Sequence, residues 1–339
     1  MIVSIISPCR NEADYIDAYV SAVLAQRQDG FELEVVIADG LSNDGTADKL
    51  ADWARREPRL KVIENPGQIV STGLNLALQH ARGEVIVRMD IHTTYASDYV
   101  AQCVKALKET GATCVGGPWI ARGESFLQRA IAAAFQSRFG SGGAASRRHD
   151  YSGPVDTVYL GAWRREELAA LGGFDEALVR NQDDELNLRI IRGGGRVWQS
   201  SAIKSVYAPR GSFAALFRQF HQYGYWKIPV LQKHRLPAST RHVAPFAFLA
   251  LLVVLAAAAP FSTASGIALA GLVMVYLVAA MVFAWRAKAE EGRSIGQAAA
   301  VAAAFACMHF GYASGFGRGV WDFAVLRRHA GAAMRRLTR

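Results

Sequence analysis

The sequence predicts an α/β domain built on a parallel sheet, followed by an α-helical membrane region. In the first 90 residues, short β-branched runs alternate with segments of helical spacing, which is typical of a parallel sheet covered by helices on both faces. After His242 the composition changes to two uncharged, apolar stretches. Each has about 20 residues, enough to cross a bilayer, although two buried helices of a soluble core would read the same way.

The alternation can be followed element by element. Strands are expected at 2–7 and 33–38 and in "LKVIEN" and "GEVIVRMD"; the helices between them are "EADYIDAYVSAVLAQ", "TADKLADWARRE" and "VSTGLNLALQHA". In the first of these helices Ile16, Val20 and Val23 share one face. After Asp90 the pattern loosens. It leaves an extended segment at "DTVYLGAW" and helices at "GESFLQRAIAAAFQSRF", "REELAALGGFDE" and "RNQDDELNLRIIRGGG".

Charge and cysteine content indicate the partners and the cellular compartment expected for the protein. The net charge is +9, but Lys and Arg gather beside the apolar stretches and in the tail "RRHAGAAMRRLTR". This distribution fits anionic lipid and the positive-inside rule, and because no nucleic-acid-binding motif accompanies it we expect no nucleic-acid partner. The four scattered cysteines are expected to be free thiols in a reducing compartment. The first residues form a strand and not a signal peptide, so the front domain should stay in the cytoplasm.

These features divide the chain into four parts. We expect a cytoplasmic domain at 1–211, an interfacial amphipathic segment at 212–241, a transmembrane region at 242–317 and a basic tail at 318–339. Spans are expected at about 243–261 and 266–285. The third apolar segment, 294–317, is rich in glycine, and we expect it to be re-entrant or interfacial with the tail inside. The alternative for 212–241 is an aromatic helix packed on the domain.

Polar side chains follow three of the predicted strands. Asn11 and Glu12 come after the first, Asp39 after the second and Asp90 after the fourth. Ligands of parallel sheets bind outside the carboxyl ends of the strands, so these residues are candidates for one site. In "ADGLSNDGT" the carboxylate of Asp39 could accept hydrogen bonds from a base such as uracil. The same letters, with Ser42 after the turn, are equally good turn and helix-capping chemistry.

The run "VRMDIHT" is a candidate metal site. Asp90 and His92 are two residues apart, so in extended chain their side chains project to one side. A carboxylate with an imidazole suits Mn²⁺ or, with less preference for nitrogen, Mg²⁺. Such an ion would bridge two phosphates and neutralise a leaving diphosphate.

Three adjacent acids, Asp183, Asp184 and Glu185, begin the helix in "RNQDDELNLR". Helical spacing groups Asp183 with Leu186 on a face turned toward the core or a cleft, while Asp184 stays unassigned. Glu185 stands four residues before Arg189, which predicts an exposed ion pair. Backbone N–H groups of the first turn should hold the pKa of Asp183 down. The alternative is that all three acids merely cap the helix.

Taken in order, the motifs resemble a known family. "PCRNE", "ADGLSNDGT", "NPGQIVSTGLNLAL", "RMDIH", "VDTVYLGAWRRE", "GGFDE", "RNQDDELNLR" and "QYGYWK" occur as in family 2 inverting glycosyltransferases of the bacterial succinoglycan and exopolysaccharide type. The resemblance covers roughly residues 2–235 and is looser over the membrane tail. It implies a GT-A (Rossmann-like) fold that binds a nucleoside diphosphate sugar, most often UDP-linked.

The resemblance also implies roles for particular residues. Asp39 would contact the uracil, and the nucleotide pocket would be completed by Pro8, Asn11, Glu12 and Ser42. Asp90 would be the first Asp of the D-x-D metal motif, whose second Asp is replaced here by His92. Asp183 would be the catalytic base, beside Gln182 in place of the usual Glu. The Q-x-x-R-W motif of processive enzymes is missing, so one sugar should be added per encounter.

The expected reaction is a single in-line displacement that inverts the anomeric carbon. The donor would be a UDP-sugar, expected to be UDP-glucose, and the acceptor a polyprenyl-diphosphate-linked saccharide at the bacterial inner membrane, within a polysaccharide assembly complex. Candidates for the acceptor and its phosphates are Arg164, Arg165, Asp184, Arg218 and Lys227. The alternatives are a polyprenyl-monophosphate glycosyltransferase and a catalytically silent sugar-nucleotide-binding scaffold.

Overall fold

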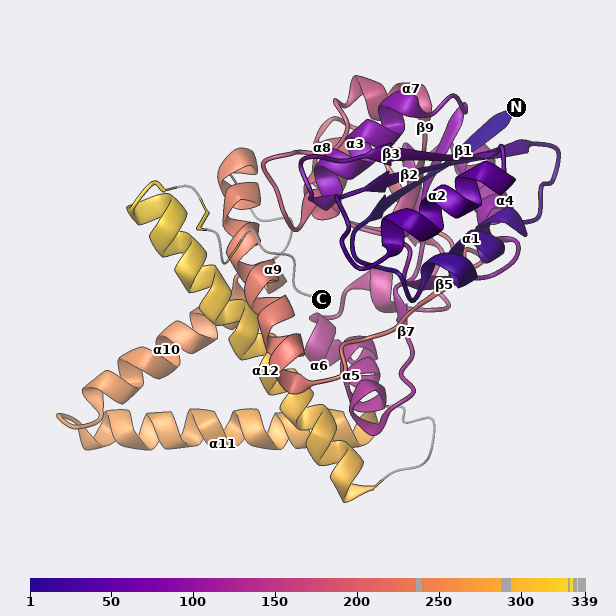
Figure 1. Ribbon diagram of the computed structural model, residues 1–339. Helices are drawn as coiled ribbons and strands as arrows, with labels where there is room; N and C mark the ends of the chain where they lie inside the picture. Colours follow the sequence, from indigo (N-terminus) through magenta and orange to yellow (C-terminus); the bar gives the residue numbers. More distant parts are fainter. Residues whose placement is uncertain (236–239, 288–293, 329, 332–333, 335–339) are drawn as a thin grey trace. The chain divides into compact units, whose positions relative to one another are not determined.

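The computed structural model describes residues 1–235, 240–287, 294–328, 330–331 and 334 (Figure 1). The chain divides into two compact units. The sheet unit comprises Met1–Ile120 and Arg148–Tyr207, and the helical unit comprises Ala121–Arg147 and Ala208–Arg339. Residues 121–147, which the sequence placed inside the front domain, therefore cluster with the C-terminal helices.

The sheet unit contains an eight-stranded sheet in the order β3-β2-β1-β4-β9-β6-β10-β8. Its strands are β1 (Ile2–Cys9), β2 (Glu32–Asp39), β3 (Leu60–Glu64), β4 (Val85–Arg88), β6 (Cys114–Gly117), β8 (Gly153–Pro154), β9 (Tyr159–Arg164) and β10 (Val197–Gln199). β3, β2, β1 and β4 are parallel neighbours, as predicted. A separate antiparallel pair joins β5 (Thr93–Tyr95) to β11 (Ser205–Tyr207), and β7 (Ile120–Ala121) lies where the two units join along the chain.

β9 runs against the neighbouring strands, a direction that the sequence left open. β9 is antiparallel to both β4 and β6, with Tyr159 opposite Gly117 and Arg164 opposite Val85. A parallel strand must begin at the amino edge of the sheet after a crossover. The chain between β6 and β9 instead re-enters at the carboxyl edge, where β6 ended. The start of β9 therefore lies at the same edge as the end of β4.

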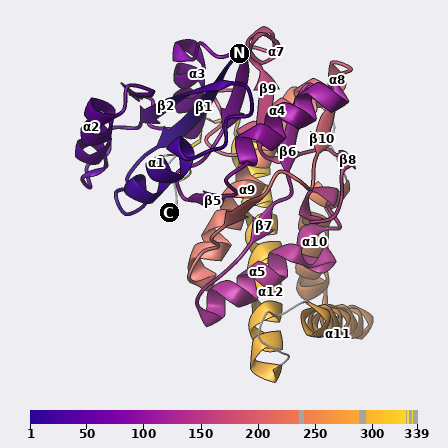
Figure 2. The ribbon, with the colours of Figure 1, turned by 90° about the vertical axis from the view of Figure 1, so that its right-hand side faces the viewer.

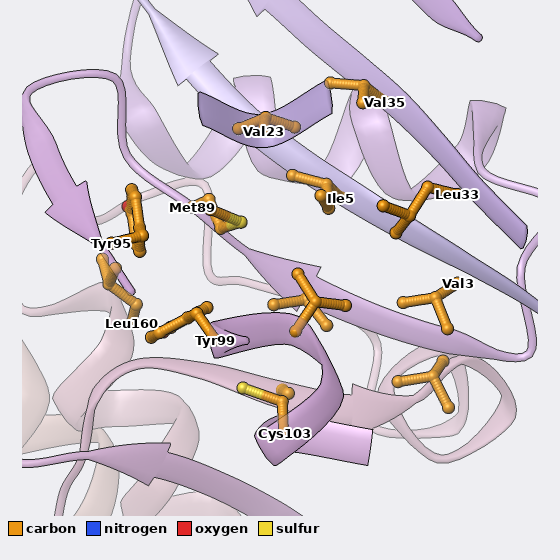
Figure 3. Packing of buried hydrophobic residues seen from close by; sticks show 14 of the residues in the cluster. Val3, Ile5, Val23, Leu33, Val35, Met89, Tyr95, Tyr99, Cys103 and Leu160 are labelled. Carbon is orange, nitrogen blue, oxygen red and sulfur yellow. The ribbon is translucent and has the colours of Figure 1, made fainter. Parts of the chain in front are cut away.

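Helices cover both faces of the sheet, as the alternation predicted. One face carries α1 (Ile16–Leu24), α2 (Thr46–Arg56) and α4 (Tyr99–Thr110), and the other carries α3 (Val70–His80), α7 (Arg165–Ala170) and α8 (Gln182–Arg192). Successive strand residues point to opposite faces. Ile5 thus joins the core under α1 and α4, which Figure 3 shows, while Ile6 joins the core under α3 and α8. This double burial fixes the register of β1 and with it the position of the residues that follow it.

The helical unit begins with α5 (Phe126–Gln136), α6 (Arg138–Ser141) and a 3₁₀ turn at Ala145–Arg147, and continues after the sheet unit with α9 (Phe213–His234). A 3₁₀ turn at Thr240–His242, α10 (Ala244–Ala258), α11 (Thr263–Arg286) and α12 (Ile295–Gly319) follow, and α12 runs into a π-helical turn at Val320–Val325. α9 and α12 lie side by side (Figures 1 and 2).

Two helices in the described part of the chain are long and apolar enough to cross a membrane, namely α11 and the continuous helix 295–325. The second expected span, 266–285, lies within α11. The first, 243–261, contains a helix of only 15 residues, which rises about 22 Å and is shorter than a hydrocarbon core of about 30 Å. The third segment is one uninterrupted helix, so the expected re-entrant break is wrong. An interfacial position for 294–317 stays a prediction.

The segment predicted to lie at the membrane interface, 212–241, forms α9 as far as His234. Tyr225, Trp226 and Lys227 are consecutive and all buried, so this part of α9 is covered on more than one face. α9 packs along α12 within the helical unit, whereas the alternative interpretation placed an aromatic helix on the front domain. Residues 236–239 lie outside the described residues.

Three glycines on α12 explain how the two helices approach so closely. Gly311, Gly315 and Gly319 are spaced by four and therefore lie on one face. A Cβ at Gly315 would overlap the backbone carbonyl of His221 on α9, and one at Gly311 would crowd the carbonyl of Phe217. Small residues at this spacing allow helix backbones to touch, as in G-x-x-x-G pairs. The abundance of glycine in this segment is visible in the sequence, but its role follows only from the nearby backbone of α9.

We expect Gly315→Ala to destabilise the helical unit by about 1–3 kcal/mol, because the new methyl group must push α9 away from α12. The matched control is Gly271→Ala on α11, where a Cβ would meet no atom within 4 Å. Thermal unfolding of the detergent-solubilised protein should show a lower midpoint for Gly315→Ala and no loss for Gly271→Ala. Equal midpoints in the two variants would contradict the packing argument.

Candidate functional site

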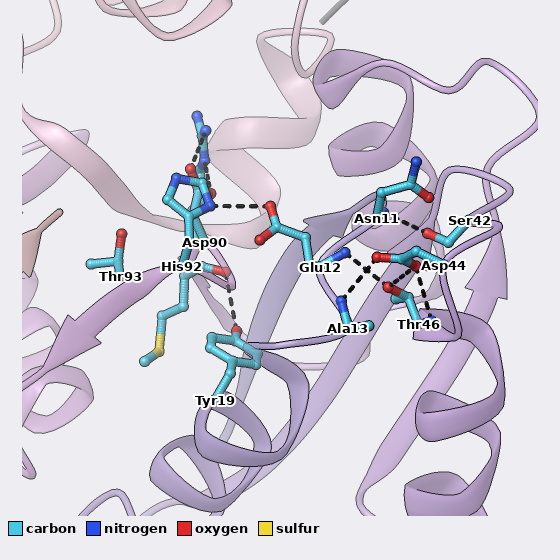
Figure 4. Close-up of polar contacts among 12 residues, drawn as sticks. Asn11, Glu12, Ala13, Tyr19, Ser42, Asp44, Thr46, Asp90, His92 and Thr93 are labelled. Atoms are coloured by element: carbon cyan, nitrogen blue, oxygen red, sulfur yellow. Dashed lines mark hydrogen bonds and ion pairs between the residues drawn. The ribbon is translucent and has the colours of Figure 1, made fainter. Parts of the chain in front are cut away.

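The loops after β1 and β2 are locked together by side-chain hydrogen bonds. Cys9 and Asp39 end the two strands side by side. Beyond them Asn11, with φ 54°, donates its backbone N–H to Ser42 Oγ at 2.8 Å (Figure 4). Its Oδ1 accepts the N–H of Asn43 at 3.0 Å. Pro8 immediately precedes Cys9 on β1 and lies in register with Ala38 on β2. The structure thus brings together the strand-end residues expected to bind the nucleotide.

Asp39 is buried, and its carboxylate stabilises the turn that was the alternative interpretation of "ADGLSNDGT". One carboxylate oxygen accepts the backbone N–H of Ser42 at 3.1 Å, and the other accepts its hydroxyl at 2.5 Å. Ser42 therefore holds Asp39 in place while also accepting from Asn11. These two hydrogen bonds hold the carboxylate in one orientation.

Asp44 supplies the turn and capping chemistry expected for "ADGLSNDGT", although the sequence did not single it out. Its carboxylate accepts the N–H of Ala13 at 3.2 Å and, through its second oxygen, the N–H and hydroxyl of Thr46 at 3.0 and 2.6 Å. Burial alone would raise the pKa of Asp44, but these hydrogen bonds outweigh it and hold the pKa below its ordinary value. The D-x-T spacing before a helix is the signal that could have found it.

Glu12 and His92 form the second layer of the site. Thr46 Oγ1 accepts the N–H of Glu12 at 2.8 Å, and the buried Glu12 carboxylate lies 3.2 Å from His92 Nδ1 (Figure 4). The His92 ring also packs edge-on to Tyr207, with centroids 6.2 Å apart. One nitrogen of His92 is thus oriented by a carboxylate, a common arrangement in metal sites.

Asp90 is held by a neighbour that the sequence analysis overlooked. Arg88, at the end of β4, donates Nε and Nη2 to the two oxygens of Asp90 at 2.8 and 2.9 Å. Arg88 is only 5% exposed. Within the described residues no group of three or more His, Cys, Asp or Glu could hold a metal. The two groups expected to bind a metal are instead engaged by protein neighbours, Asp90 by Arg88 and His92 by Glu12.

Asp183, in the first turn of α8, has a different electrostatic setting from the one predicted. Desolvation raises the pKa of Asp183; the nearby Arg88 lowers it in part, and Asp184 raises it further. The prediction that backbone N–H groups keep this pKa low is wrong, because the loss of water outweighs them. Asp183 Oδ1 does accept the N–H of Asp184, at 2.9 Å. The charge of Arg88 is thus one of the influences on the pKa of Asp183.

Glu185 and Arg189 pair as predicted, but the expected exposure is wrong. Glu185 is fully buried, and its oxygens accept Arg189 Nε and Nη2 at 3.2 and 2.5 Å. Arg189 also donates to the carbonyl of Leu171. α8 is covered on more than its apolar face, because Asn187 and Leu188 are buried as well. The pair anchors the helix that presents Asp183.

The acceptor candidates fall in different places. Arg164 lies opposite Val85 at the amino edge of the sheet, away from the strand ends, and pairs with Glu167 at 3.1 Å. Arg165 follows it, and its backbone N–H donates a hydrogen bond to the carbonyl of Glu84. This location removes both arginines from the candidate site. Asp184 stays beside Asp183. Arg218 and Lys227 belong to α9 of the helical unit, Arg218 exposed and Lys227 buried.

Comparison with known proteins identifies the family. The model of "Glycosyl transferase family 2" matches residues 4–167. Succinoglycan biosynthesis protein ExoA of Rhizobium meliloti is 33% identical over 94% of this chain and 95% of its own length. The chain belongs to glycosyl transferase family 2. It is a glycosyltransferase of polysaccharide biosynthesis, and the resemblance drawn from its motifs is confirmed.

Two further similarities extend this picture. A Methanococcus voltae enzyme is 24% identical over 74% of this chain and 80% of its own length; it is named dolichyl N-acetyl-alpha-D-glucosaminyl phosphate 3-beta-D-2,3-diacetamido-2,3-dideoxy-beta-D-glucuronosyltransferase. Among solved structures, mannosyltransferase PcManGT from Pyrobaculum calidifontis in complex with GDP-Man and Mn²⁺ aligns with a TM-score of 0.58 and 23% identity, covering 94% of this chain and 87% of that one. This last likeness concerns the fold alone, and it confirms a GT-A-like architecture for the family 2 chain.

Within this family 2 enzyme, we expect Glu185→Gln to lower the free energy of unfolding by about 3 kcal/mol, because it leaves the guanidinium of Arg189 without its counter-charge in a buried place. The matched control is Glu109→Gln, which removes another i,i+4 pair. That pair, with Lys105 at 3.8 Å, is exposed and should contribute no more than about 0.5 kcal/mol. Urea unfolding of both variants measures the difference. A loss at Glu185 no larger than that at Glu109 would contradict the buried anchor.

Proposed function

We propose that the protein transfers one sugar, expected to be glucose, from a UDP-sugar to a polyprenyl-diphosphate-linked saccharide, with inversion at the anomeric carbon. The observation that carries the proposal is the buried Arg88. It pairs with Asp90 at the end of β4 and interacts electrostatically with Asp183 at the start of α8. A single-displacement transferase needs a carboxylate on the donor diphosphate's side and a base on the acceptor's side, and the sheet unit supplies both around one guanidinium.

On the donor side, the locked loops after β1 and β2 supply the nucleotide pocket. We propose that Asp39 accepts the N–H of the uracil, with Ser42 fixing the carboxylate. The other lining residues are Pro8, Asn11 and Glu12. Asn11 and Ser42 are hydrogen-bonded to each other, so the pocket is pre-organised and little ordering cost remains when the nucleotide binds.

On the acceptor side, Asp183 is the proposed general base. Its raised pKa makes it a stronger base than an ordinary aspartate, closer to the working pH, where proton transfer is most effective. As the acceptor hydroxyl oxygen bonds to the anomeric carbon, its proton passes to a carboxylate oxygen of Asp183. The bond from that carbon to the diphosphate oxygen breaks at the same time, and UDP leaves with the electron pair.

A divalent cation, Mn²⁺ or Mg²⁺, when bound, would neutralise charge on the departing diphosphate. We propose Asp90 and His92 as the protein groups that hold it, with Glu12 orienting the imidazole. The family resemblance and the chemistry of these donors support a divalent ion without selecting between the two.

The acceptor class rests on the membrane features and on the relatives' names. α11 and the helix 295–325 have the length and composition of membrane spans. One relative is named for succinoglycan biosynthesis and another for a dolichyl-phosphate-linked sugar. We therefore propose a multi-pass protein of the bacterial inner membrane with its sheet unit in the cytoplasm, acting in a polysaccharide assembly complex. Of the remaining cations, the exposed Arg218 is the better candidate for the lipid diphosphate.

We expect Asp183→Asn to lower the rate of transfer by at least about a thousandfold, because the amide cannot accept the acceptor's proton, while UDP binding is unchanged. Transfer is measured as UDP release in the presence of acceptor, and binding by calorimetry. Asp150→Asn, at an exposed carboxylate of the same unit, is the control and should leave both unchanged. Activity retained in Asp183→Asn would favour the polyprenyl-monophosphate alternative, and no UDP release by the wild type would favour the silent scaffold.

The same variant has a second readout that does not depend on activity. Because the pKa of Asp183 is raised in the folded state, its contribution to stability is present below the unfolded pKa and is lost as the pH rises through the folded pKa. At neutral pH the ionised carboxylate therefore costs stability, and Asp183→Asn should unfold at the same or a higher temperature than the wild type. A large drop would show that Asp183 is chiefly structural.

A further inference from the structure

Arg88 has one more hydrogen-bonding group than its neighbours use. Nε and Nη2 are committed to Asp90, but Nη1 is buried and finds no hydrogen-bond partner among the residues that the structure describes. A buried guanidinium N–H that loses water without gaining an acceptor destabilises the folded state. Such a group in a native site therefore calls for a functional reason.

The charge of Arg88 is shared between two carboxylates that the reaction uses differently. Asp90 holds it directly, and Asp183 interacts with the same charge from α8. Arg88 also lies near Tyr159, whose strand begins at the carboxyl edge. The free enzyme therefore already contains one cation at the place where a metal ion would need Asp90.

A divalent cation that binds Asp90 alone would meet two obstacles. It would have to share or displace a carboxylate that is already neutralised by a bidentate guanidinium, and it would be repelled by that fixed charge in a partly desolvated place, where charges act strongly. The protein also offers few further ligands, since the described residues contain no cluster of three or more acid, His or Cys groups for a metal. A nucleoside diphosphate removes both obstacles, because its oxygens complete the ligand set and its negative charge offsets the guanidinium.

We propose that Arg88 is a resident counter-cation that makes metal binding at Asp90 conditional on the donor's diphosphate. The inference rests on the proposed function, because it takes Asp90 as a metal ligand and UDP as part of the donor. In this role Arg88 is a positioning residue. It keeps Asp90 aligned in the empty enzyme, and its uncommitted Nη1 is available to an oxygen of the incoming diphosphate.

The test is Mn²⁺ binding to the full-length, detergent-solubilised protein, followed by the electron paramagnetic resonance signal of free Mn²⁺, with and without UDP. In the wild type, UDP should tighten Mn²⁺ binding at least about tenfold. In Arg88→Met, Mn²⁺ alone should bind about tenfold or more tighter than in the wild type, because the repelling charge is gone, and the effect of UDP should shrink. Arg88→Lys keeps the charge and should bind Mn²⁺ alone as weakly as the wild type.

A double variant assigns the effect to the intended carboxylate. Asp90→Asn in the Arg88→Met background should abolish the gain in Mn²⁺ affinity. Circular dichroism shows which variants fold. In a folded Arg88→Met variant, Mn²⁺ binding that is unchanged or weaker than in the wild type overturns the proposal. If Arg88→Met does not fold, the wild type provides the test, because tight Mn²⁺ binding without UDP overturns the proposal. If the wild type binds neither UDP nor Mn²⁺ with UDP, the proposed function fails instead, and the two failures are therefore distinct.

Discussion

The parallel pairing of β1 with β2 and β4 is the constraint on which the candidate site depends. Both faces of β1 are buried, so its register cannot slip by one residue without moving every side chain to the opposite face. With that register fixed, Cys9 and Asp39 end side by side, and the loops after them can lock through Asn11 and Ser42. The end of β4 then places Arg88 and Asp90 at the same edge. Strand pairing therefore positions Pro8 and Asp39. Asn11 and Ser42, which lie in the loops beyond the strands, are positioned by the hydrogen bonds between those loops.

Buried charge is the second theme of the sheet unit. The Glu185–Arg189 pair stabilises the position of α8, and the Arg88–Asp90 pair stabilises the end of β4. Removing one partner from a buried pair is costly because the other is left uncompensated. The two buried pairs lie where Asp90 and Asp183 are presented. The Arg88–Asp90 pair holds Asp90 itself, and the Glu185–Arg189 pair holds the helix that carries Asp183.

The sequence predicted the parts of this arrangement that depend on local patterns. Strand–helix alternation and the polar residues at strand ends located Asp39 and Asp90, because parallel strands must bring their carboxyl ends to one edge. The motif order led to Asp183 and to the family. Helical spacing also found the Glu185–Arg189 pair. Spacing says nothing of what covers a helix, however, so the burial of Glu185 and the raised pKa of Asp183 could not be predicted.

Other features depended on contacts between distant segments. The antiparallel direction of β9 is decided by where the chain re-enters the sheet, which periodicity does not record. The motif "VRMDIHT" indicated Asp90 but not Arg88. Arg88 is hydrogen-bonded to Asp90 and interacts electrostatically with Asp183. The glycines of α12 were visible as a composition, but their role required the backbone of α9 beside them. In each case the missing information was the identity of the packing partner.

The central claim is that this family 2 enzyme transfers a single sugar with inversion to a lipid-linked acceptor. The most direct measurement incubates the purified protein with UDP-glucose and a polyprenyl-diphosphate-linked sugar, then determines the product's mass and anomeric configuration by mass spectrometry and NMR. We predict the addition of one hexose through a β-linkage. Products carrying a series of added sugars, or an α-linkage formed from the α-linked donor, would contradict it.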